Sequence, residues 1–263
     1  MKLGSISENL NSEKRISITP EIAKKYIGLG FEVYLNSNYG SHLGFQDKKY
    51  EELNVKIFND PKEVIKKSDL ILQLDLLDSD KSDLIKENQT LIGIFNPYIN
   101  KQKIENLIKK KVNIFSLELL PRITRAQSMD VLSSQANLAG YKAVVESFAN
   151  FQKAIPMMMT AAGTIPAARV LVIGAGVAGL QAIATAKRMG AIVFATDVRT
   201  ASKEQVESLG GKFLTVEDSE NLESEGGYAK EASKDFKKKQ EKLLNDTLKK
   251  IDIVICTALI PGK

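Results

Sequence analysis

Three glycines mark the stretch whose residue types and spacing are best suited to chemistry. Gly174, Gly176 and Gly179 form the pattern G-x-G-x-x-G, directly after an apolar run and at the start of a helix-like segment. At this spacing the first glycine permits a tight turn, the second lets the backbone approach a pyrophosphate, and the third allows a helix to pack closely on a strand. The N-terminus of that helix attracts phosphates. We therefore predict a dinucleotide site formed by Gly174, Ala175, Gly176, Val177, Ala178 and Gly179, the alternative being a glycine turn that serves packing alone.

A carboxylate follows at the place where a ribose contact is expected. Asp197 ends the next apolar run, 18 residues after Gly179, and can accept hydrogen bonds from both hydroxyls of an adenosine ribose. It would repel a 2′-phosphate, so the segment Asp197, Val198 and Arg199 favours NAD(H) over NADP(H), although the cation of Arg199 works against that preference. A surface cap is the alternative role for Asp197.

A second group of polar side chains lies in PRITRAQSMDVLSSQ, residues 121–135. Arginine, glutamine, aspartate and serine are placed there among apolar residues, just before a helix-like run. The apolar neighbours suggest burial, and polar groups are costly to bury without partners. From the spacing alone, an ion pair between Arg122 and Asp130 and a helix cap at Ser133 are as well supported as a ligand site.

A conventional catalytic base is hard to find. A dehydrogenase that acts on an alcohol or amine needs a proton acceptor, usually histidine or lysine. The single histidine, His42, lies in NYGSHLGF, far from the glycine pattern in the sequence, and is predicted to be a surface-loop residue. No set of His, Asp and Glu has metal-ligand spacing. Direct hydride exchange between two nicotinamides would need no base, only the positioning of the donor and acceptor carbons.

The bulk composition excludes several classes of protein. A length of 263 residues predicts two domains with separate cores, and the net charge of +5 comes from scattered lysines rather than a nucleic-acid patch. The N-terminus lacks the apolar stretch of a signal peptide, and the most apolar stretch, 154–180, is interrupted too often for a transmembrane segment. The single cysteine, Cys256, is expected to be buried in a strand and excludes a disulfide within the chain. A reducing, cytoplasmic setting fits this composition.

The elements around these residues must position them. In the first half, strands are predicted over 2–6, 31–35, 70–74, 90–95 and 112–117, and helices from Thr19-Pro20 and over 47–53, 61–67 and 101–110. In the second half, a long helix over 130–153 precedes strands over 169–174, 191–197 and 251–259. The stretch 217–244 is predicted to be an acidic loop followed by a charged helix. Strands that alternate with helices predict an α/β protein with two doubly wound, parallel-sheet (Rossmann-like) domains.

Long motifs resemble one family over the whole chain. They are RISITPE, ELLPRITRAQSMDVLSSQANLAGYKAV, PMMMTAAGTIPAARVLVIGAGVAGLQAIATAKRMGA, ATDVR, KEQVESLGGKF and GGYAKE. These motifs are similar to the NAD(H)-binding part of the alpha subunit of proton-translocating NAD(P) transhydrogenases, in the alanine dehydrogenase/transhydrogenase family. The resemblance implies an N-terminal domain over residues 1–135 and an NAD(H)-binding Rossmann domain over 136–263.

The resemblance also implies a set of site residues. Arg122, Asp130 and Ser133 match the loop around the nicotinamide, where they would hold its carboxamide. Gln127 would reach the ribose hydroxyls and face the second nucleotide, and it is the residue that we expect to act in catalysis, by positioning and without a general base. Tyr228, in GGYAKE, matches a mobile loop that closes on bound nucleotide. An exposed helix start and simple loop packing are the alternatives for Gln127 and Tyr228.

Alanine dehydrogenases are the competing members of this family. They look similar up to Arg15, but carry a lysine after an LVLKVK-like strand and a histidine in a YLHL-type segment. Here the first region holds Gln73 and Asp75, and Asn96 falls where the histidine would be. The missing pair disfavours amino-acid oxidation and agrees with the lack of a base.

The implied activity is reversible hydride transfer between NAD(H) on this chain and NADP(H) on a partner subunit, coupled to proton translocation. The family implies a homodimer, together with membrane and NADP(H)-binding partner subunits that hold the chain on the cytoplasmic side of the membrane. The family's domain continues beyond ALIPGK, so we expect an incomplete second sheet, in a fragment or a split subunit. A soluble alanine-type dehydrogenase and a non-catalytic NAD-binding module are the alternative functions.

Overall fold

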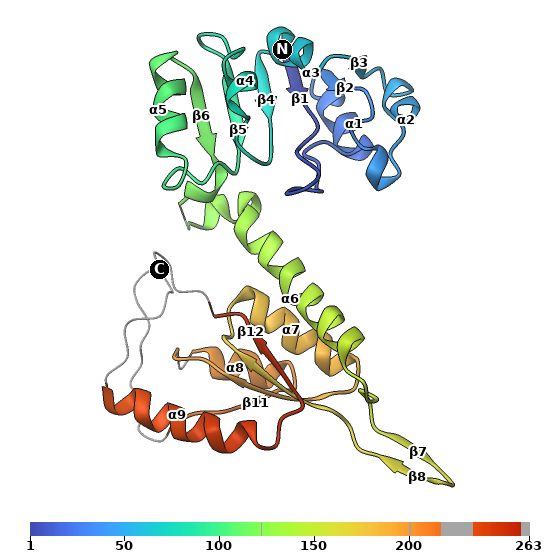
Figure 1. Cartoon of the computed structure of the whole chain (residues 1–263), viewed down its shortest axis with the longest axis vertical. Coiled ribbons are helices and arrows are strands. Elements are labelled where there is room, and N and C mark those ends of the chain that lie inside the picture. Colours follow the sequence, from blue (N-terminus) through green and yellow to red (C-terminus); the bar gives the residue numbers. More distant parts are fainter. Residues whose placement is uncertain (122, 200, 217–233, 259–263) are drawn as a thin grey trace. The chain divides into compact units, whose positions relative to one another are not determined.

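The computed structural model of the chain describes residues 1–121, 123–199, 201–216 and 234–258. It divides into two compact units, Met1–Asp130 and Val131–Lys263. Each unit has its own parallel sheet (Figure 1). The boundary that we predict, after residue 135, falls inside a helix that belongs wholly to the second unit. No helix within the described ranges combines the length and the apolar character needed to cross a bilayer.

The first unit is built on a parallel sheet whose described strands run in the order β3-β2-β1-β4-β5-β6. The order reverses between β1 and β4, so the sheet is doubly wound and has a switch point at the carboxyl ends of those two strands. The strands are β1 (Lys2–Ser5), β2 (Glu32–Asn36), β3 (Lys56–Phe58), β4 (Leu70–Leu72), β5 (Thr90–Gly93) and β6 (Asn113–Ser116).

Capping residues set the starts of the helices that cover this sheet. The hydroxyl of Thr19 accepts the N–H of Ile22 at 3.3 Å, and α1 (Pro20–Gly28) begins with proline at its first position, as predicted. Asp60 caps α3 (Pro61–Lys67) in the same way. The other elements are α2 (Asp47–Glu51), α4 (Ser79–Ser82), α5 (Lys101–Lys109) and the 3-10 turns η1 (Ser41–Leu43), η2 (Leu117–Leu119) and η3 (Thr124–Met129).

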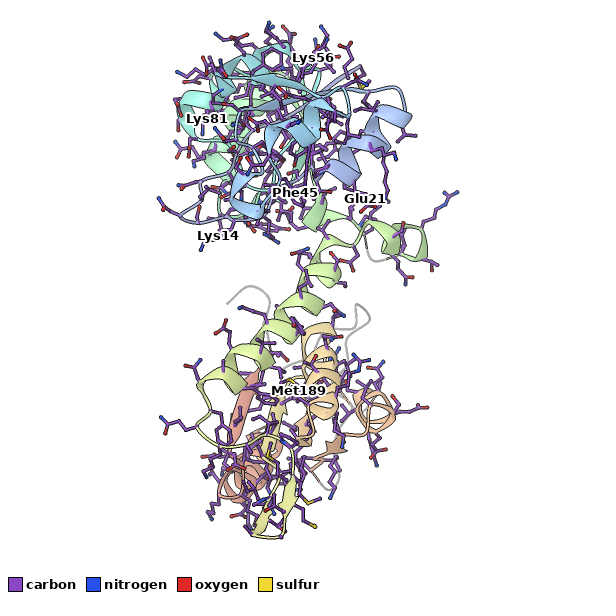
Figure 2. All side chains as sticks on the ribbon, turned by 90° about the vertical axis from the view of Figure 1, so that its right-hand side faces the viewer. Lys14, Glu21, Phe45, Lys56, Lys81 and Met189 are labelled. Atoms are coloured by element: carbon purple, nitrogen blue, oxygen red, sulfur yellow. The ribbon has the colours of Figure 1, made fainter. Side chains whose placement is uncertain are left out.

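Apolar clusters cover both faces of the first sheet. Leu3 and Val33 belong to one cluster, with side chains from α1. Ile71 and Leu91 belong to the other, with side chains from α3 and α5. Charged side chains such as Lys56 project from the surface (Figure 2). With both faces covered, the strand ends are the part of the sheet left to form sites.

The second unit repeats the pattern with the strand order β11-β10-β9-β12 among its described residues. Every neighbouring pair is parallel, and the order reverses between β9 and β12. The strands are β9 (Arg169–Ile173), β10 (Ile192–Thr196), β11 (Lys212–Phe213) and β12 (Ile253–Cys256), and the helices are α6 (Val131–Asn150), α7 (Val177–Arg188), α8 (Ser202–Ser208) and α9 (Lys234–Leu248). The predicted doubly wound α/β architecture is confirmed.

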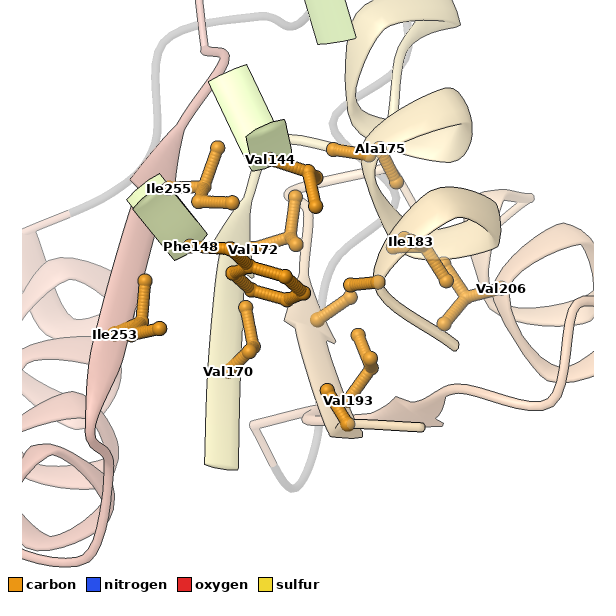
Figure 3. Close-up of a cluster of buried hydrophobic side chains, with 14 residues drawn as sticks. Val144, Phe148, Val170, Val172, Ala175, Ile183, Val193, Val206, Ile253 and Ile255 are labelled. Atoms are coloured by element: carbon orange, nitrogen blue, oxygen red, sulfur yellow. The ribbon is translucent and has the colours of Figure 1, made fainter. Parts of the chain in front are cut away.

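Helices α6 and α7 pack on one face of the second sheet. Val144 and Phe148 of α6 lie against Val172 of β9 in the core of this unit (Figure 3). Helix α6 also approaches α7 so closely that a Cβ on Gly140 would overlap the carbonyl oxygen of Ala178. This contact holds the first turn of α7, the turn that follows the glycine pattern, against α6.

One antiparallel hairpin was not predicted. β7 (Met158–Thr160) pairs with β8 (Gly163–Ile165), and every residue of both strands is exposed. The prediction has a loop before the strand at 169–174. The segment has no alternation of apolar and polar residues, and alternation is the signal by which a strand is recognised from its sequence.

The prediction of a buried Cys256 is wrong. β12 lies at an edge of the described sheet, where Ile253 and Ile255 face the core while Val254 and Cys256 are exposed. Successive side chains of a strand point to opposite faces. The run IDIVICTAL is mostly apolar on both faces, so the sequence does not show which residues face the core.

Several element ends also differ from the prediction. The helix predicted over 47–53 ends at Glu51, and the chain then turns through Asn54, which has a left-handed backbone conformation (φ 64°). The long helix predicted over 130–153 spans Val131–Asn150. The prediction does not include β3, β11, α4 and α8, which are too short for a periodic pattern to be recognised.

Candidate functional site

The glycine pattern lies where the strand order of the second sheet reverses. Gly174 follows β9 with φ 94°, a left-handed conformation that residues other than glycine rarely adopt. A Cβ on Gly174 would lie 2.8 Å from the backbone nitrogen of Ala258, and a Cβ on Gly179 would overlap the carbonyl oxygen of Gly174. The loop is therefore a tight turn that brings α7 directly onto β9.

The first turn of α7 faces open space beside Gly176. This glycine is the N-cap residue, with extended backbone, and it provides no side chain to cap the helix. The nearest described atom outside the loop to a Cβ at Gly176 would be Nη2 of Arg199, at 3.9 Å. Val177, the first helical residue, is exposed. The first N–H groups of a helix carry partial positive charge, and without a cap they suit an anion such as a phosphate.

Thr257 braces this turn, a role that the sequence analysis missed. Its hydroxyl donates to the carbonyl oxygen of Gly174 at 2.8 Å, and its N–H donates to the carbonyl of Ile173 at 2.8 Å. Thr257 follows β12, which is the strand across the switch point from β9. The only signal in the sequence was its position just after the last predicted strand, which without the pairing of β12 with β9 has no functional meaning.

The carboxylate of Asp197 lies just after β10 with both oxygens engaged. Oδ2 accepts the N–H of Ala175 at 2.7 Å, and Oδ1 accepts the N–H of Arg199 at 2.9 Å. The Arg199 guanidinium donates from Nε to Oδ1 and from Nη2 to Oδ2, both at 2.9 Å. Burial alone would raise the pKa of Asp197, but these donors outweigh it and hold that pKa below its ordinary value. Asp197 is therefore an anion at neutral pH, attached to the glycine loop through Ala175.

The residues predicted for the nicotinamide loop belong to both units. Gln127 lies exposed in η3, and the partly buried Asp130 follows, its N–H donating to the Gln127 carbonyl at 3.3 Å. Ser133 is partly buried in the first turn of α6. Arg122 and Tyr228 lie outside the described residues. That these side chains act together on one cofactor stays a prediction.

The burial expected for this polar segment is wrong for most of it. Ala126 is 6% exposed and is the residue that η3 buries. The neighbouring side chains of Thr124, Arg125, Gln127 and Ser128 are exposed. Water can satisfy exposed polar groups, so the cost of burial does not by itself require a ligand here.

The switch point of the first sheet is closed by side chains. Gln73 follows β4 and is 2% exposed, and its amide donates to the carbonyl of Ile6 at 2.9 Å and accepts the Ile6 N–H at 3.3 Å. Nearby, Glu8 accepts the N–H of Leu74 at 2.6 Å. Burial raises the pKa of Glu8 and outweighs the opposing hydrogen bonds from Leu74 and Gln73. These bonds join β1 to β4 in the place where a doubly wound sheet usually binds a small molecule.

The other candidates in the first unit are also engaged or exposed. An amino-acid substrate needs a cation for its carboxylate, but Arg15 forms a forked pair with Glu13, donating from Nε and Nη2 at 2.9 and 2.6 Å. His42 is exposed in η1, as predicted, and its Nε2 lies 2.8 Å from the carbonyl oxygen of Lys14. Asn96 is exposed, with a left-handed backbone (φ 46°).

Two family models together match nearly the whole chain. The model for "Alanine dehydrogenase/PNT, N-terminal domain" matches residues 4–139, and the model for "Alanine dehydrogenase/PNT, C-terminal domain" matches residues 143–263. The first match contains Gln127 and Asp130. The second contains the glycine loop and Asp197.

Individual relatives agree with this assignment. The first of the separate chains that make up the NAD(P) transhydrogenase alpha subunit of Rickettsia prowazekii is 48% identical over 267 residues, which cover all of this chain and 70% of the relative. The crystal structure of transhydrogenase from Sinorhizobium meliloti superposes with a TM-score of 0.86 at 41% identity, covering all of this chain and 71% of that chain. An alanine dehydrogenase of Methanococcus maripaludis is 23% identical over 265 residues, covering all of this chain and 65% of the relative. Among these three, the two transhydrogenases are the more similar.

Proposed function

This chain belongs to the alanine dehydrogenase/PNT family, and we propose that it is the NAD(H)-binding part of a proton-translocating NAD(P) transhydrogenase. Its second unit binds NAD(H). Hydride passes directly and reversibly between that cofactor and NADP(H) held by a partner subunit. Proton translocation through a membrane part of the complex is coupled to this transfer.

One observation carries the proposal: the hydrogen bond between Asp197 and the N–H of Ala175 unites a ribose acceptor with a phosphate-binding turn. The open N-terminus of α7 at Gly176 suits the pyrophosphate, and the ionised Asp197 suits the hydroxyls of the adenosine ribose. The chemistry of these groups fits a dinucleotide that lacks a 2′-phosphate. Ala175, Val177, Ala178, Gly179 and Val198 complete the contact surface.

The family resemblance supplies the residues for the nicotinamide. Its carboxamide oxygen takes donors, which Arg122 and Ser133 provide, and its NH₂ takes an acceptor, which Asp130 provides. Gln127 both donates and accepts, so it can hold ribose hydroxyls and meet the second nucleotide. Tyr228 closes over the bound nucleotide.

Catalysis rests on positioning. The bound nicotinamide supplies or accepts the hydride, and none of the residues assigned to the site has to take up a proton. Gln127 orients the nicotinamide ribose, while Asp130 and Ser133 fix the carboxamide and with it the direction of the ring. Correct orientation of two reactants contributes roughly 7–11 kcal/mol to lowering a barrier, which makes orientation the main task of this loop.

The proposed assembly has several chains. The relative from Rickettsia prowazekii is named as one portion of an alpha subunit, which supports a complex of several subunits. In that complex this chain forms a homodimer and joins NADP(H)-binding and membrane subunits on the cytoplasmic side of the membrane. Residues 1–135 then supply the nicotinamide loop, and residues 136–263 supply the nucleotide turn.

Two alternatives remain open to test. A soluble alanine-type dehydrogenase is disfavoured because Gln73 spends both ends of its amide on Ile6 and Arg15 is paired with Glu13. A non-catalytic NAD-binding module would bind the cofactor but would not support exchange.

The test combines binding with exchange. NADH is titrated into the chain and into the Asp197→Ala variant, for which the loss of hydrogen bonds to a charged group, about 1.5–3 kcal/mol each, predicts at least about tenfold weaker binding. NADP(H)-binding and membrane subunits are then added, and NADH-dependent reduction of an NADP analogue is followed. Reduction of NAD by alanine without partners would favour the dehydrogenase, and NADH binding without exchange would favour the non-catalytic module. Tighter binding of NADPH than of NADH by the parent would overturn the cofactor assignment.

A further inference from the structure

Asp197 has more partners than a ribose-binding carboxylate can keep. A carboxylate offers about four lone-pair positions, and four N–H donors already point at this one: those of Ala175 and Arg199 in the backbone, and Nε and Nη2 of the Arg199 side chain. Two ribose hydroxyls need two of these positions. The guanidinium of Arg199 therefore has to release Asp197 when the adenosine ribose of NAD(H) binds.

Arg199 lies at the entrance to the same site. Its Nη2 would be 3.9 Å from a Cβ on Gly176, and its side chain is 22% exposed. A guanidinium released from Asp197 is therefore next to the proposed ribose position. Guanidinium groups bind phosphates through two parallel hydrogen bonds and keep their charge at every physiological pH.

We infer that Arg199 is a latent ligand for a 2′-phosphate and that its ion pair with Asp197 prevents it from acting as one. The Asp197–Arg199 pair, rather than Asp197 alone, then sets the preference for NAD(H) over NADP(H). This inference rests on the proposed function. Asp197 acts twice: its charge repels the phosphate, and its oxygens occupy the cation that would attract it.

Simple repulsion and the release of Arg199 make different predictions. If Asp197 acted by repulsion alone, removing its charge would improve NADPH binding equally with or without Arg199. If Asp197 restrains Arg199, the improvement requires the guanidinium. The two substitutions are then strongly non-additive in the cofactor preference.

The experiment measures dissociation constants for NADH and NADPH, from the fluorescence of the reduced nicotinamide, on the full chain. Asp197→Asn retains an oxygen that can accept the Ala175 N–H, and we expect it to shift the preference toward NADPH at least tenfold. Adding Arg199→Ala to that variant should remove most of the shift, and adding Arg199→Lys should keep part of it. Arg188→Ala, at the exposed end of α7, controls for the loss of one positive charge and should leave the shift intact.

Equal NADPH binding by Asp197→Asn with and without Arg199→Ala would overturn the inference. If Asp197→Asn does not fold, Asp197→Ser with the same partner substitutions gives the same comparison. If the parent does not bind NADH, the proposed function itself fails. If the parent binds NADH but the paired variants do not differ, only the role of Arg199 fails.

Discussion

At the scale of single residues, two carboxylates near the two switch points have pKa values displaced in opposite directions. Burial dominates at Glu8 and raises its pKa, because the hydrogen-bond partners of Glu8 are neutral and the nearby Asp75 is an acid. At Asp197 the guanidinium of Arg199 and two backbone donors outweigh burial and lower the pKa. Asp197 is thus suited to remain an anionic acceptor, whereas ionisation of Glu8 opposes folding.

This contrast predicts a pH effect on stability. Because the folded-state pKa of Glu8 lies above its ordinary value of 4.5, the stability that Glu8 contributes is complete below about pH 4.5 and is lost as the pH rises through the folded pKa. Glu8→Gln can still accept the Leu74 N–H and does not ionise. Urea unfolding from pH 4 to pH 7 should show the parent losing stability relative to this variant.

The matched control has the opposite sign. The hydrogen bonds from Arg15 lower the pKa of Glu13, so the contribution of Glu13 is present above pH 4.5 and is lost as the pH falls through its folded pKa. Relative to Glu13→Gln, the parent should therefore gain stability as the pH rises. Parallel pH profiles for the two variants would contradict both assignments.

Gln127 permits a second test at this scale. Gln127→Asn keeps the amide but shortens its reach by one methylene, and a misplacement of about 1 Å can cost about a hundredfold in rate. In the assembled complex we expect hydride transfer to fall by about that factor while NADH affinity changes little. Gln102→Asn, an exposed glutamine on α5, should leave both quantities unchanged. Equal transfer rates for Gln127→Asn and the parent would exclude the positioning role.

At the scale of elements, the candidate site depends on how α7 is held. Its N-terminus meets the glycine turn on one side and α6 on the other, where Gly140 lies against the carbonyl of Ala178. Thr257 then ties the turn to the end of β12. A backbone held from three directions can present its N–H groups in a fixed pattern, which is what a pyrophosphate requires.

Substitution of Gly140 tests this arrangement. A methyl group in Gly140→Ala would overlap the Ala178 carbonyl, and overpacking of this kind costs about 1–3 kcal/mol. We expect lower stability in chemical unfolding and weaker NADH binding. Gly28→Ala makes the same chemical change at the end of α1, where nothing lies within 4 Å of the new methyl group, and it should be neutral or slightly stabilising. A Gly140→Ala variant as stable as the parent would show that α6 can move away at no cost.

At the scale of the whole molecule, the two units have the same doubly wound plan but differ at their switch points. In the first unit Gln73 and Glu8 fill the crevice with hydrogen bonds to the facing strand. In the second unit the turn at Gly176 is open. The same fold thus gives one unit a closed sheet edge and the other an edge that can accept a ligand.

Hydrogen exchange can locate the ligand. At a free NADH concentration of a hundred times the dissociation constant, binding stabilises the native state by about 2.7 kcal/mol. Because each unit has its own core, amides of β9 and β10 should gain protection by up to that amount, and amides of β4 and β5 should gain much less. Equal gains in both sheets would show that the units open together or that NADH also binds the first unit.

Local chemistry is why much of this protein can be predicted from its sequence. The start of α1 depends on Thr19 and Pro20, and the glycine turn depends on residues within six positions of each other. The doubly wound architecture follows from the alternation of strand and helix along the chain. Tertiary structure alone decided the exposure of Cys256, the closure of the first switch point by Gln73 and the brace at Thr257. Each of these depends on which distant segment lies opposite, since a side chain has a function only once the strand pairing has chosen its partners.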